Sequence, residues 1–156
     1  MSGWTEGMRT SLSDRWSTPR YLFEHMDREF HFTVDVCADS TNHKCARYYD
    51  EETDGLSQDW SGEVCWMNPP YGREIGRWVH KARVSAEQGA IVVALVPART
   101  DTRWWREDMV HATEWRFING RVRFGEGAGS APFPSVLAVF GTPRMPVVSQ
   151  VTIREG

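Results

Sequence analysis

Apolar positions alternate along the chain between continuous runs and stripes at helical spacing. Runs without polar alternation are typical of strands that are covered on both faces, as in a parallel sheet. We expect such strands at residues 32–38, 63–67, 90–97 and 135–141. The intervening stripes predict helices at residues 17–30, 73–88 and 100–111. Strands that alternate with helices predict an α/β sandwich with a mostly parallel sheet.

Potential capping residues indicate where two of the expected helices should begin. Ser17 or Thr18 can cap the first helix, and Pro19 suits its first turn because the first helical N–H has no partner to lose. Thr100 or Asp101 is expected to cap the helix that follows the longest apolar run.

The last third of the chain predicts one antiparallel strand and a loop. Asn119-Gly120 is a hairpin-turn sequence, so residues 114–120 and 121–125 are expected to pair. A Gly/Pro-rich loop follows at 125–134. The length of 156 residues suits one compact domain. We divide the chain into a flexible lead (1–16), one domain (17–141) and a tail or edge strand (142–156).

Charge is distributed unevenly, although the net charge is only −3. Residues 1–67 carry 13 acidic and 6 basic side chains, whereas residues 71–123 carry 6 acidic and 10 basic ones. The basic half could present one face to a phosphate backbone. Charge alone fits an ordinary solvated surface equally well. The eight tryptophans could fill a core or stack on bases.

Cysteine usage and hydropathy bear on the compartment. No apolar run approaches a membrane span, and the N-terminus has no secretion-signal core. We therefore expect a cytoplasmic protein with reduced thiols. Cys37, His43 and Cys45 lie close in sequence, but no CxxC pair accompanies them, so we expect no metal.

Polar residues follow two of the expected strands at the point where each strand ends. Asp35 lies near the end of the first strand, and "NPPYG" (68–72) follows the second. Ligands of open parallel sheets bind outside the carboxyl ends of the strands, so both groups should face one crevice.

The stretch "NPPYG" suits chemistry on an amino group. The side-chain carbonyl of Asn68 and the backbone carbonyl of Pro69 can accept both protons of an aromatic amine, whose lone pair is otherwise delocalised. Holding both protons favours a tetrahedral nitrogen that can attack an electrophile. The two prolines, Pro69 and Pro70, supply rigidity, and the ring of Tyr71 can stack on a flat base.

These motifs resemble a known family. "NPPY" after a strand resembles the catalytic motif of amino-methyltransferases that use S-adenosylmethionine. The wider pattern over residues 16–141 resembles the phage-type DNA N-6-adenine-methyltransferase (Dam) family, in "STPRYLFEHMDREFHFTVDVCADSTNHKCARYY", "DGLSQDWSGEVCWMNPPYG", "LVPARTDTRWW", "FINGRVRF" and "APFPSVLAVF". The resemblance implies a Rossmann-like methyltransferase fold and methyl transfer to the 6-amino group of adenine in double-stranded DNA. It also implies a phage or prophage gene product of a bacterial host.

The resemblance implies roles for individual residues. Asn68, Pro69, Pro70 and Tyr71 match the catalytic motif. Residues expected at the cofactor are Thr18 and Pro19 at its methionine end, Asp35 at its amino group, Asp54 or Asp59 at its adenine amine, and Asp50 or Glu51 at its ribose.

The chain departs from many methyltransferases after the first strand. They carry a glycine-rich loop of the FxGxG kind, and here the corresponding stretch is "DVCADS". Ala38 and Ser40 are small, so the backbone can still approach a cofactor closely.

Basic residues on the expected crevice side are candidates for DNA contacts. Arg99, Arg103 and Arg106 can contact phosphates, and Trp104 or Trp105 can stack beside a flipped base while at least one of them packs in the core. Arg121 and Arg123 flank the Gly/Pro-rich loop, which could enter a groove. We expect no separate target-recognition domain, because the expected domain takes up most of these 156 residues.

Two other functions remain open from the sequence. The chain could methylate another amine, such as the cytosine 4-amino group, an RNA base or a protein glutamine, because "NPPY" serves all of these. It could also be an inactive DNA-binding protein on the same fold. The sequence predicts neither the target site nor the oligomeric state.

Overall fold

A computed structural model describes residues 16–125 and 129–155, and most of the expected N-terminal lead lies outside them. The helices are α2 (Arg20–Phe30), α3 (Ile75–Glu87) and α4 (Arg103–Glu107), with 3-10 turns η1 (Gly55–Ser57) and η2 (Met109–His111). The strands are β1 (Val34–Asp35), β2 (Val64–Met67), β3 (Ile91–Pro97), β4 (Glu114–Ile118), β5 (Ser135–Phe140) and β6 (Val147–Val151).

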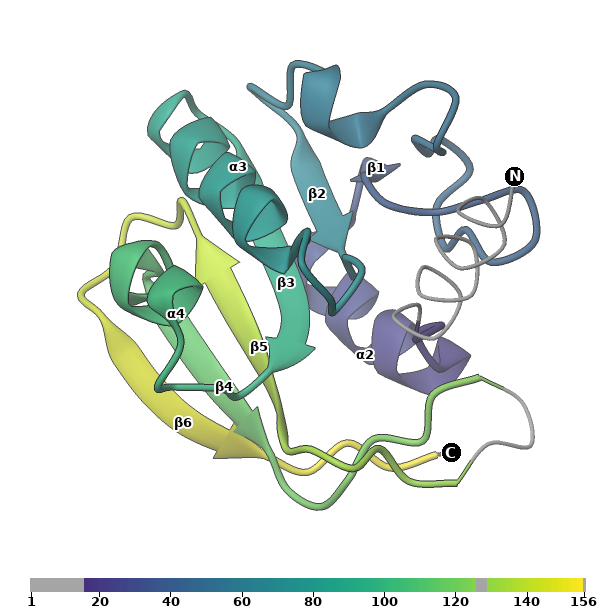
Figure 1. Cartoon of the computed structure of the whole chain (residues 1–156), viewed down its shortest axis with the longest axis vertical. Coiled ribbons are helices and arrows are strands. Elements are labelled where there is room, and N and C mark those ends of the chain that lie inside the picture. Colours follow the sequence, from purple (N-terminus) through teal and green to yellow (C-terminus); the bar gives the residue numbers. More distant parts are fainter. Residues whose placement is uncertain (1–15, 126–128, 156) are drawn as a thin grey trace.

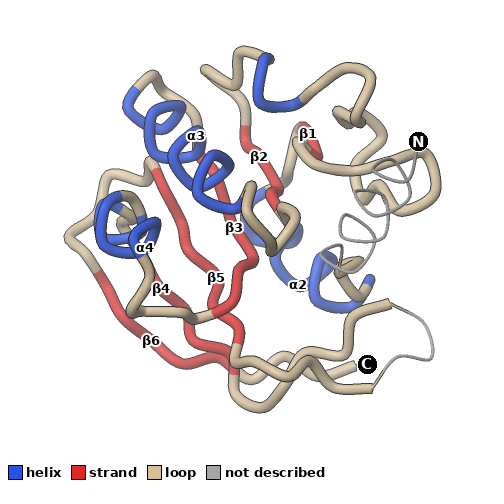
Figure 2. Tube along the Cα trace, in the orientation of Figure 1, coloured by secondary structure: helices blue, strands red, loops and turns tan. Residues whose placement is uncertain are grey.

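The strands form one six-stranded sheet in the order β1-β2-β3-β5-β4-β6 (Figure 2). The pairs β1–β2, β2–β3 and β4–β6 are parallel, and β5 runs antiparallel to both of its neighbours, β3 and β4. The expected mixed α/β architecture with an antiparallel late strand is confirmed. The tail supplies an edge strand, β6.

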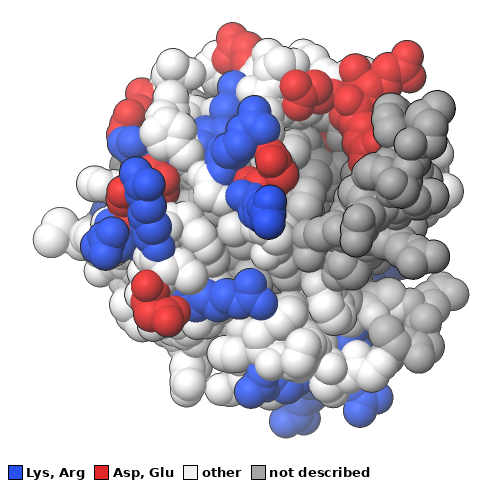
Figure 3. Space-filling view, viewed as in Figure 1, with Lys and Arg blue, Asp and Glu red and all other residues white. Residues whose placement is uncertain are grey.

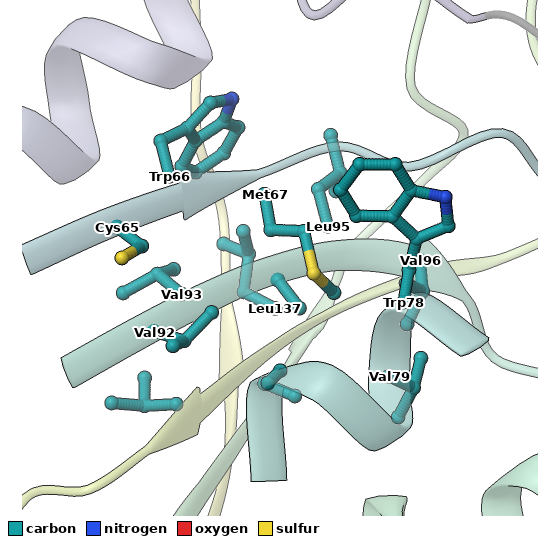
Figure 4. Close-up of a cluster of buried hydrophobic side chains, with 14 of the residues drawn as sticks. Cys65, Trp66, Met67, Trp78, Val79, Val92, Val93, Leu95, Val96 and Leu137 are labelled. Atoms are coloured by element: carbon teal, nitrogen blue, oxygen red, sulfur yellow. The ribbon is translucent and has the colours of Figure 1, made fainter. Parts of the chain in front are cut away.

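Helices cover both faces of the sheet. In Figure 1, α3 and α4 lie in front of the sheet and α2 lies behind it. Side chains of β2 alternate between these layers: Trp66 packs edge-on against Phe23 of α2, while Met67 points toward Trp78 of α3 (Figure 4). β3 and β5 are buried along nearly their whole length. Their continuous apolar sequence is therefore explained by cover on both faces.

Two expected helix starts were wrong. α2 begins at Arg20 with Pro19 at the cap position in an extended conformation and without a side-chain cap. Neither Ser17 nor Thr18 caps it, and the Thr18 hydroxyl accepts from Asn68 instead. The second error concerns α4, whose cap is Thr102: its side chain accepts from the N–H of Trp105.

The expected hairpin was also wrong. Residues 121–125 form no strand, and β4 pairs with β5 and β6 instead. Val122 and Phe124 are buried, and the carbonyl of Val122 accepts from the N–H of Ala131. Burial of these two side chains outweighs the local turn signal at Asn119-Gly120.

The described residues also bear on membranes and thiols. None of their helices is both long and apolar enough to cross a bilayer. Cys37, Cys45 and Cys65 form no disulfide in this part of the chain. Burial raises the pKa of the Cys45 and Cys65 thiols to about 12, so neither is a reactive thiolate at neutral pH.

Candidate active site

A cavity of about 250 Å³ opens where the first strands of the sheet end. β1 contributes Asp35 to its wall, and Asn68 follows the last residue of β2. The other expected site residues that line it are Thr18, Ala38, Asp50, Glu51, Asp54, Pro69 and Pro70. The two strand ends therefore do share one crevice, as the parallel pairing of β1 with β2 requires.

The amide of Asn68 is held at both of its ends. Its Nδ2 donates to the backbone carbonyl of Trp16 and to Thr18 Oγ1, the latter at 2.9 Å. Its Oδ1 accepts from the hydroxyl of Tyr71 at 2.8 Å. An amide oxygen has two lone pairs, so Oδ1 keeps acceptor capacity for a further N–H. The side chain is fixed before any ligand arrives.

Tyr71 sits in an aromatic cage rather than at an open surface. Its ring is 4% exposed and meets Phe124 and Phe133 edge-on, with centroid distances of 6.0 and 5.6 Å. Its hydroxyl also lies 3.0 Å from the carbonyl oxygen of Leu95. Burial raises the pKa of Tyr71 well above 10, so the hydroxyl stays a donor. In this arrangement only 4% of Tyr71 is exposed, which leaves little of it for stacking on a base.

Asp35 is a buried carboxylate in the cavity wall. It is 3% exposed, and its two oxygens accept from the backbone N–H groups of Cys37 and Lys44 at 3.3 and 3.0 Å. Burial raises its pKa from 3.8 to about 6, and these two N–H groups oppose the rise. Asp35 is therefore mostly ionised at neutral pH and suited to a cation in the cavity.

The segment after β1 reaches the cavity without glycine. Ala38 lines the cavity, and its N–H donates to the carbonyl of Tyr49 at 2.9 Å. Asp39 Oδ1 accepts from the N–H groups of Thr41 and Asn42, while Asn42 Oδ1 accepts from the N–H of Asp39. Hydrogen bonds between side chains and the backbone thus stabilise this turn. The small side chain of Ala38 leaves space in the cavity.

Close packing brings "DGL" (54–56) to the cavity and turns Asp59 away from it. A Cβ on Gly55 would lie 2.0 Å from the carbonyl oxygen of Val36, so only glycine fits there. The buried Trp60 donates to the carbonyl of Gly55 at 2.9 Å. Asp54 lines the cavity, whereas Asp59 is exposed and accepts from Ser61.

Comparison with known proteins gives the family of this chain. A family model described as DNA N-6-adenine-methyltransferase (Dam) matches residues 6–145. The chain belongs to the Dam family. The DNA N-6-adenine-methyltransferase of Haemophilus phage HP1 is 30% identical over 140 residues, which cover 85% of this chain and 81% of that protein. The DNA N-6-adenine-methyltransferase of Escherichia phage T1 is 31% identical over 106 residues, which cover 67% of this chain and 44% of that protein.

The candidate DNA-contacting residues of this Dam-family chain do not form one cluster. Arg99, Arg103 and Trp104 line a second hollow beside Tyr71, between the start of α3 and α4. Arg106, Arg121 and Arg123 are exposed but line neither hollow. Trp104 and Trp105 are both half-buried, with ring centroids 5.9 Å apart.

Some residues that line the two hollows were not expected from the sequence. Trp16, which we assigned to the lead, packs edge-on against Phe124 and Phe133 and binds Asn68 through its carbonyl. Nothing local in the sequence signals this contact. Arg73 and Arg77 also line the second hollow; their positions directly after "NPPYG" were an available signal.

Metal ligands do not gather in the described part of this Dam-family chain. No group of three or more His, Cys, Asp or Glu side chains there could hold an ion. His43 Nδ1 instead lies 2.7 Å from the carbonyl oxygen of Cys45, and its ring stacks on Tyr48.

Proposed function

We propose that this chain transfers the methyl group of S-adenosylmethionine to the exocyclic 6-amino group of adenine in DNA. The observation that carries the proposal is the fixed amide of Asn68 at a cavity lined by carboxylates. An amide held at its nitrogen and at its oxygen needs no reorganisation when the reaction begins, and such preorganised dipoles are the main source of enzymatic rate acceleration.

The side chains of the cavity fit the chemistry of S-adenosylmethionine. Asp35 suits its ammonium group because the carboxylate is buried and ionised at neutral pH. Asp50 or Glu51 is the proposed partner of the ribose hydroxyls, and Asp54 is the proposed partner of the adenine amine. Trp78 supplies an apolar wall for a flat ring. When bound, the cofactor supplies an electrophilic methyl group on a cationic sulfur.

The proposed chemistry of Asn68 and Pro69 acts on the two protons of the adenine amine. Asn68 Oδ1 and the carbonyl of Pro69 each accept one N–H, which gathers the nitrogen lone pair toward the methyl carbon. The proline rings restrict the backbone around the Pro69 carbonyl, and the hydrogen bonds to Thr18 and from Tyr71 hold the side-chain amide of Asn68. One of the held protons leaves once the nitrogen has bonded to the methyl group and carries positive charge, so a strong general base is not required.

Double-stranded DNA is the proposed partner. The described domain offers exposed arginines on several surfaces, which can neutralise phosphates. The target base has to leave the duplex to reach Asn68, because its 6-amino group is otherwise paired inside the stack. Support for adenine in DNA over another amine comes from the family and from the two phage relatives.

The test is methyl transfer from radiolabelled S-adenosylmethionine to unmethylated duplex DNA, followed by nucleoside analysis. We expect label in 6-methyladenine and its loss by at least about 10²-fold in Asn68→Ala, the range for removal of one preorganised group. Asn119→Ala is the matched control, because Asn119 lies beyond β4 and binds Thr152. Label in cytosine, or in RNA or protein supplied as alternative acceptors, would contradict adenine as the substrate. No label in DNA, RNA or protein would contradict methyl transfer itself.

A further inference from the structure

A second hollow adjoins the cofactor cavity on the other side of the catalytic motif. It is an open groove between the start of α3 and α4, and Tyr71 and Gly72 form part of its wall. Arg77 lines both hollows, so the groove and the cavity that Asn68 lines adjoin each other at this side chain. We call it the arginine groove after its four arginines, Arg73, Arg77, Arg99 and Arg103.

The two hollows carry opposite charge. The cofactor cavity is lined by five carboxylates and one guanidinium: Asp35, Asp50, Glu51, Asp54, Glu74 and Arg77. The arginine groove is lined by four guanidiniums and the two carboxylates of Glu107 and Asp108. Figure 3 shows Lys and Arg gathered over α3 and α4, and acidic side chains gathered where the chain leads into η1. A cationic cofactor and a polyanion are thus directed to different hollows.

The carboxylates of the groove are already engaged. Glu107 pairs with Arg103 at 2.7 Å, and Asp108 pairs with Arg83 at 2.7 Å. Within residues 16–125 and 129–155, neither Arg73 nor Arg99 has a carboxylate within ion-pair distance. Both guanidiniums are exposed, so they keep their donors for an incoming anion.

Arg99 is also held in place relative to the catalytic motif. Its guanidinium lies over the ring of Phe133, 5.5 Å from the centroid. Phe133 in turn contacts Tyr71 edge-on, and Tyr71 binds Asn68. The guanidinium therefore sits on the same aromatic cage that fixes the catalytic amide, which lowers the cost of ordering a long side chain on binding.

We propose that the phosphate backbone of the DNA strand that carries the target adenine runs along the arginine groove, with Arg73 and Arg99 binding its phosphates. The inference rests on the proposed function, because it takes Asn68 as the end point of the flipped base. The half-buried Trp104 on the groove wall supplies a flat surface beside that strand.

The experiment measures DNA binding of Arg73→Gln, Arg99→Gln and the double variant by fluorescence anisotropy. The probe is a labelled duplex of mixed sequence, titrated over a series of salt concentrations. Arg144→Gln is the matched control, because Arg144 is exposed, precedes β6 and lies away from both hollows. The Kd for S-adenosylmethionine is measured beside it.

We expect each groove substitution to weaken DNA binding about 5- to 10-fold and to lower the slope of log K against log salt by about 1. Arg144→Gln and all cofactor affinities should match the wild type. Wild-type DNA affinity and salt slope in the double variant would overturn the groove assignment, even if methyl transfer is normal. Weakened binding without methyl transfer in the wild type would support the groove and contradict the proposed function.

Discussion

The hydroxyl of Tyr71 donates to Asn68 Oδ1 over 2.8 Å, so the aromatic residue of "NPPY" holds the amide of the same motif. A tyrosine ring after two prolines suggests stacking on a base. Here the ring is enclosed by Phe124 and Phe133, and its polar end faces the amide. Orientation of Asn68 is therefore a role that Tyr71 performs before any base enters.

Tyr71→Phe should lower kcat while leaving the fold intact. The phenylalanine ring fills the same cage, but the donor to Asn68 is lost. One neutral hydrogen bond is worth about 1 kcal/mol, which corresponds to a loss of roughly 5-fold or more in kcat. The steady-state rate of methyl transfer at saturating cofactor and DNA measures kcat. Tyr48→Phe is the control, since Tyr48 stacks on His43 and lines neither hollow. An unchanged kcat would show that Tyr71 does not orient the amide.

Thr18 holds the other end of the amide. Thr18→Val keeps the shape of this buried side chain and removes the acceptor for Asn68 Nδ2. We expect kcat to fall roughly 5- to 10-fold from loss of about one hydrogen bond. The family resemblance places Thr18 at the methionine end of the cofactor, but here its hydroxyl binds Asn68, so we expect an unchanged Kd for S-adenosylmethionine. Thr18→Ser should restore kcat. The opposite pattern, a raised Kd with normal kcat, would mean that Thr18 contacts the cofactor instead.

Asp54 and Asp59 can be compared directly, because Asp54 lines the cavity and Asp59 does not. Asp54→Asn keeps the acceptor for the N–H of Leu56 and tolerates the positive φ of 52°. We expect it to weaken cofactor binding about 10-fold, because hydrogen bonds to a charged acceptor are worth roughly 1.5 kcal/mol or more. Asp59→Asn should bind like the wild type. Calorimetric titration with S-adenosylmethionine separates them, and a larger effect of Asp59→Asn would reverse the assignment.

The sequence predicted that Asp35 and Asn68, which follow or end two neighbouring strands, would line one cavity. β3 could be recognised because its run is continuously apolar, and Asp35 and Asn68 could be placed together because parallel strands end at one edge. The cage around Tyr71 could not be predicted, since the sequence assigned Phe124 to a hairpin strand and Phe133 to a Gly/Pro-rich loop. That Asp54 lines the cavity and Asp59 does not likewise depends on Trp60, whose indole donates to the carbonyl of Gly55 from within the core.

The raised pKa of Asp35 predicts how folding stability depends on pH. Its pKa is about 6 in the folded state and 3.8 as a free side chain, so the folded protein binds more protons between these values. The contribution of Asp35 to the free energy of unfolding is therefore fully present below about pH 4 and is lost as pH rises through 6. Two pKa units correspond to about 3 kcal/mol.

The difference in the free energy of unfolding between Asp35→Asn and the wild type isolates the contribution of Asp35. Asparagine does not titrate, so the stability of the variant relative to the wild type should increase by up to about 3 kcal/mol from pH 4 to pH 7.5. Urea unfolding at several pH values measures it. Asp59→Asn controls for titration of an exposed carboxylate. A pH-independent difference for Asp35→Asn would contradict the raised pKa.

Ionisation of Asp35 should lower the stability of the fold as pH rises, but it should raise the affinity for S-adenosylmethionine. Only the carboxylate form of Asp35 attracts the ammonium group of S-adenosylmethionine, and about one tenth of it is ionised at pH 5 when the pKa is about 6. Affinity should therefore rise about 10-fold from pH 5 to pH 7.5 in the wild type. Asp35→Asn should bind weakly at every pH in this range. A wild-type affinity that stays constant through pH 6, or a variant that keeps the same pH dependence, would remove Asp35 from the ammonium site.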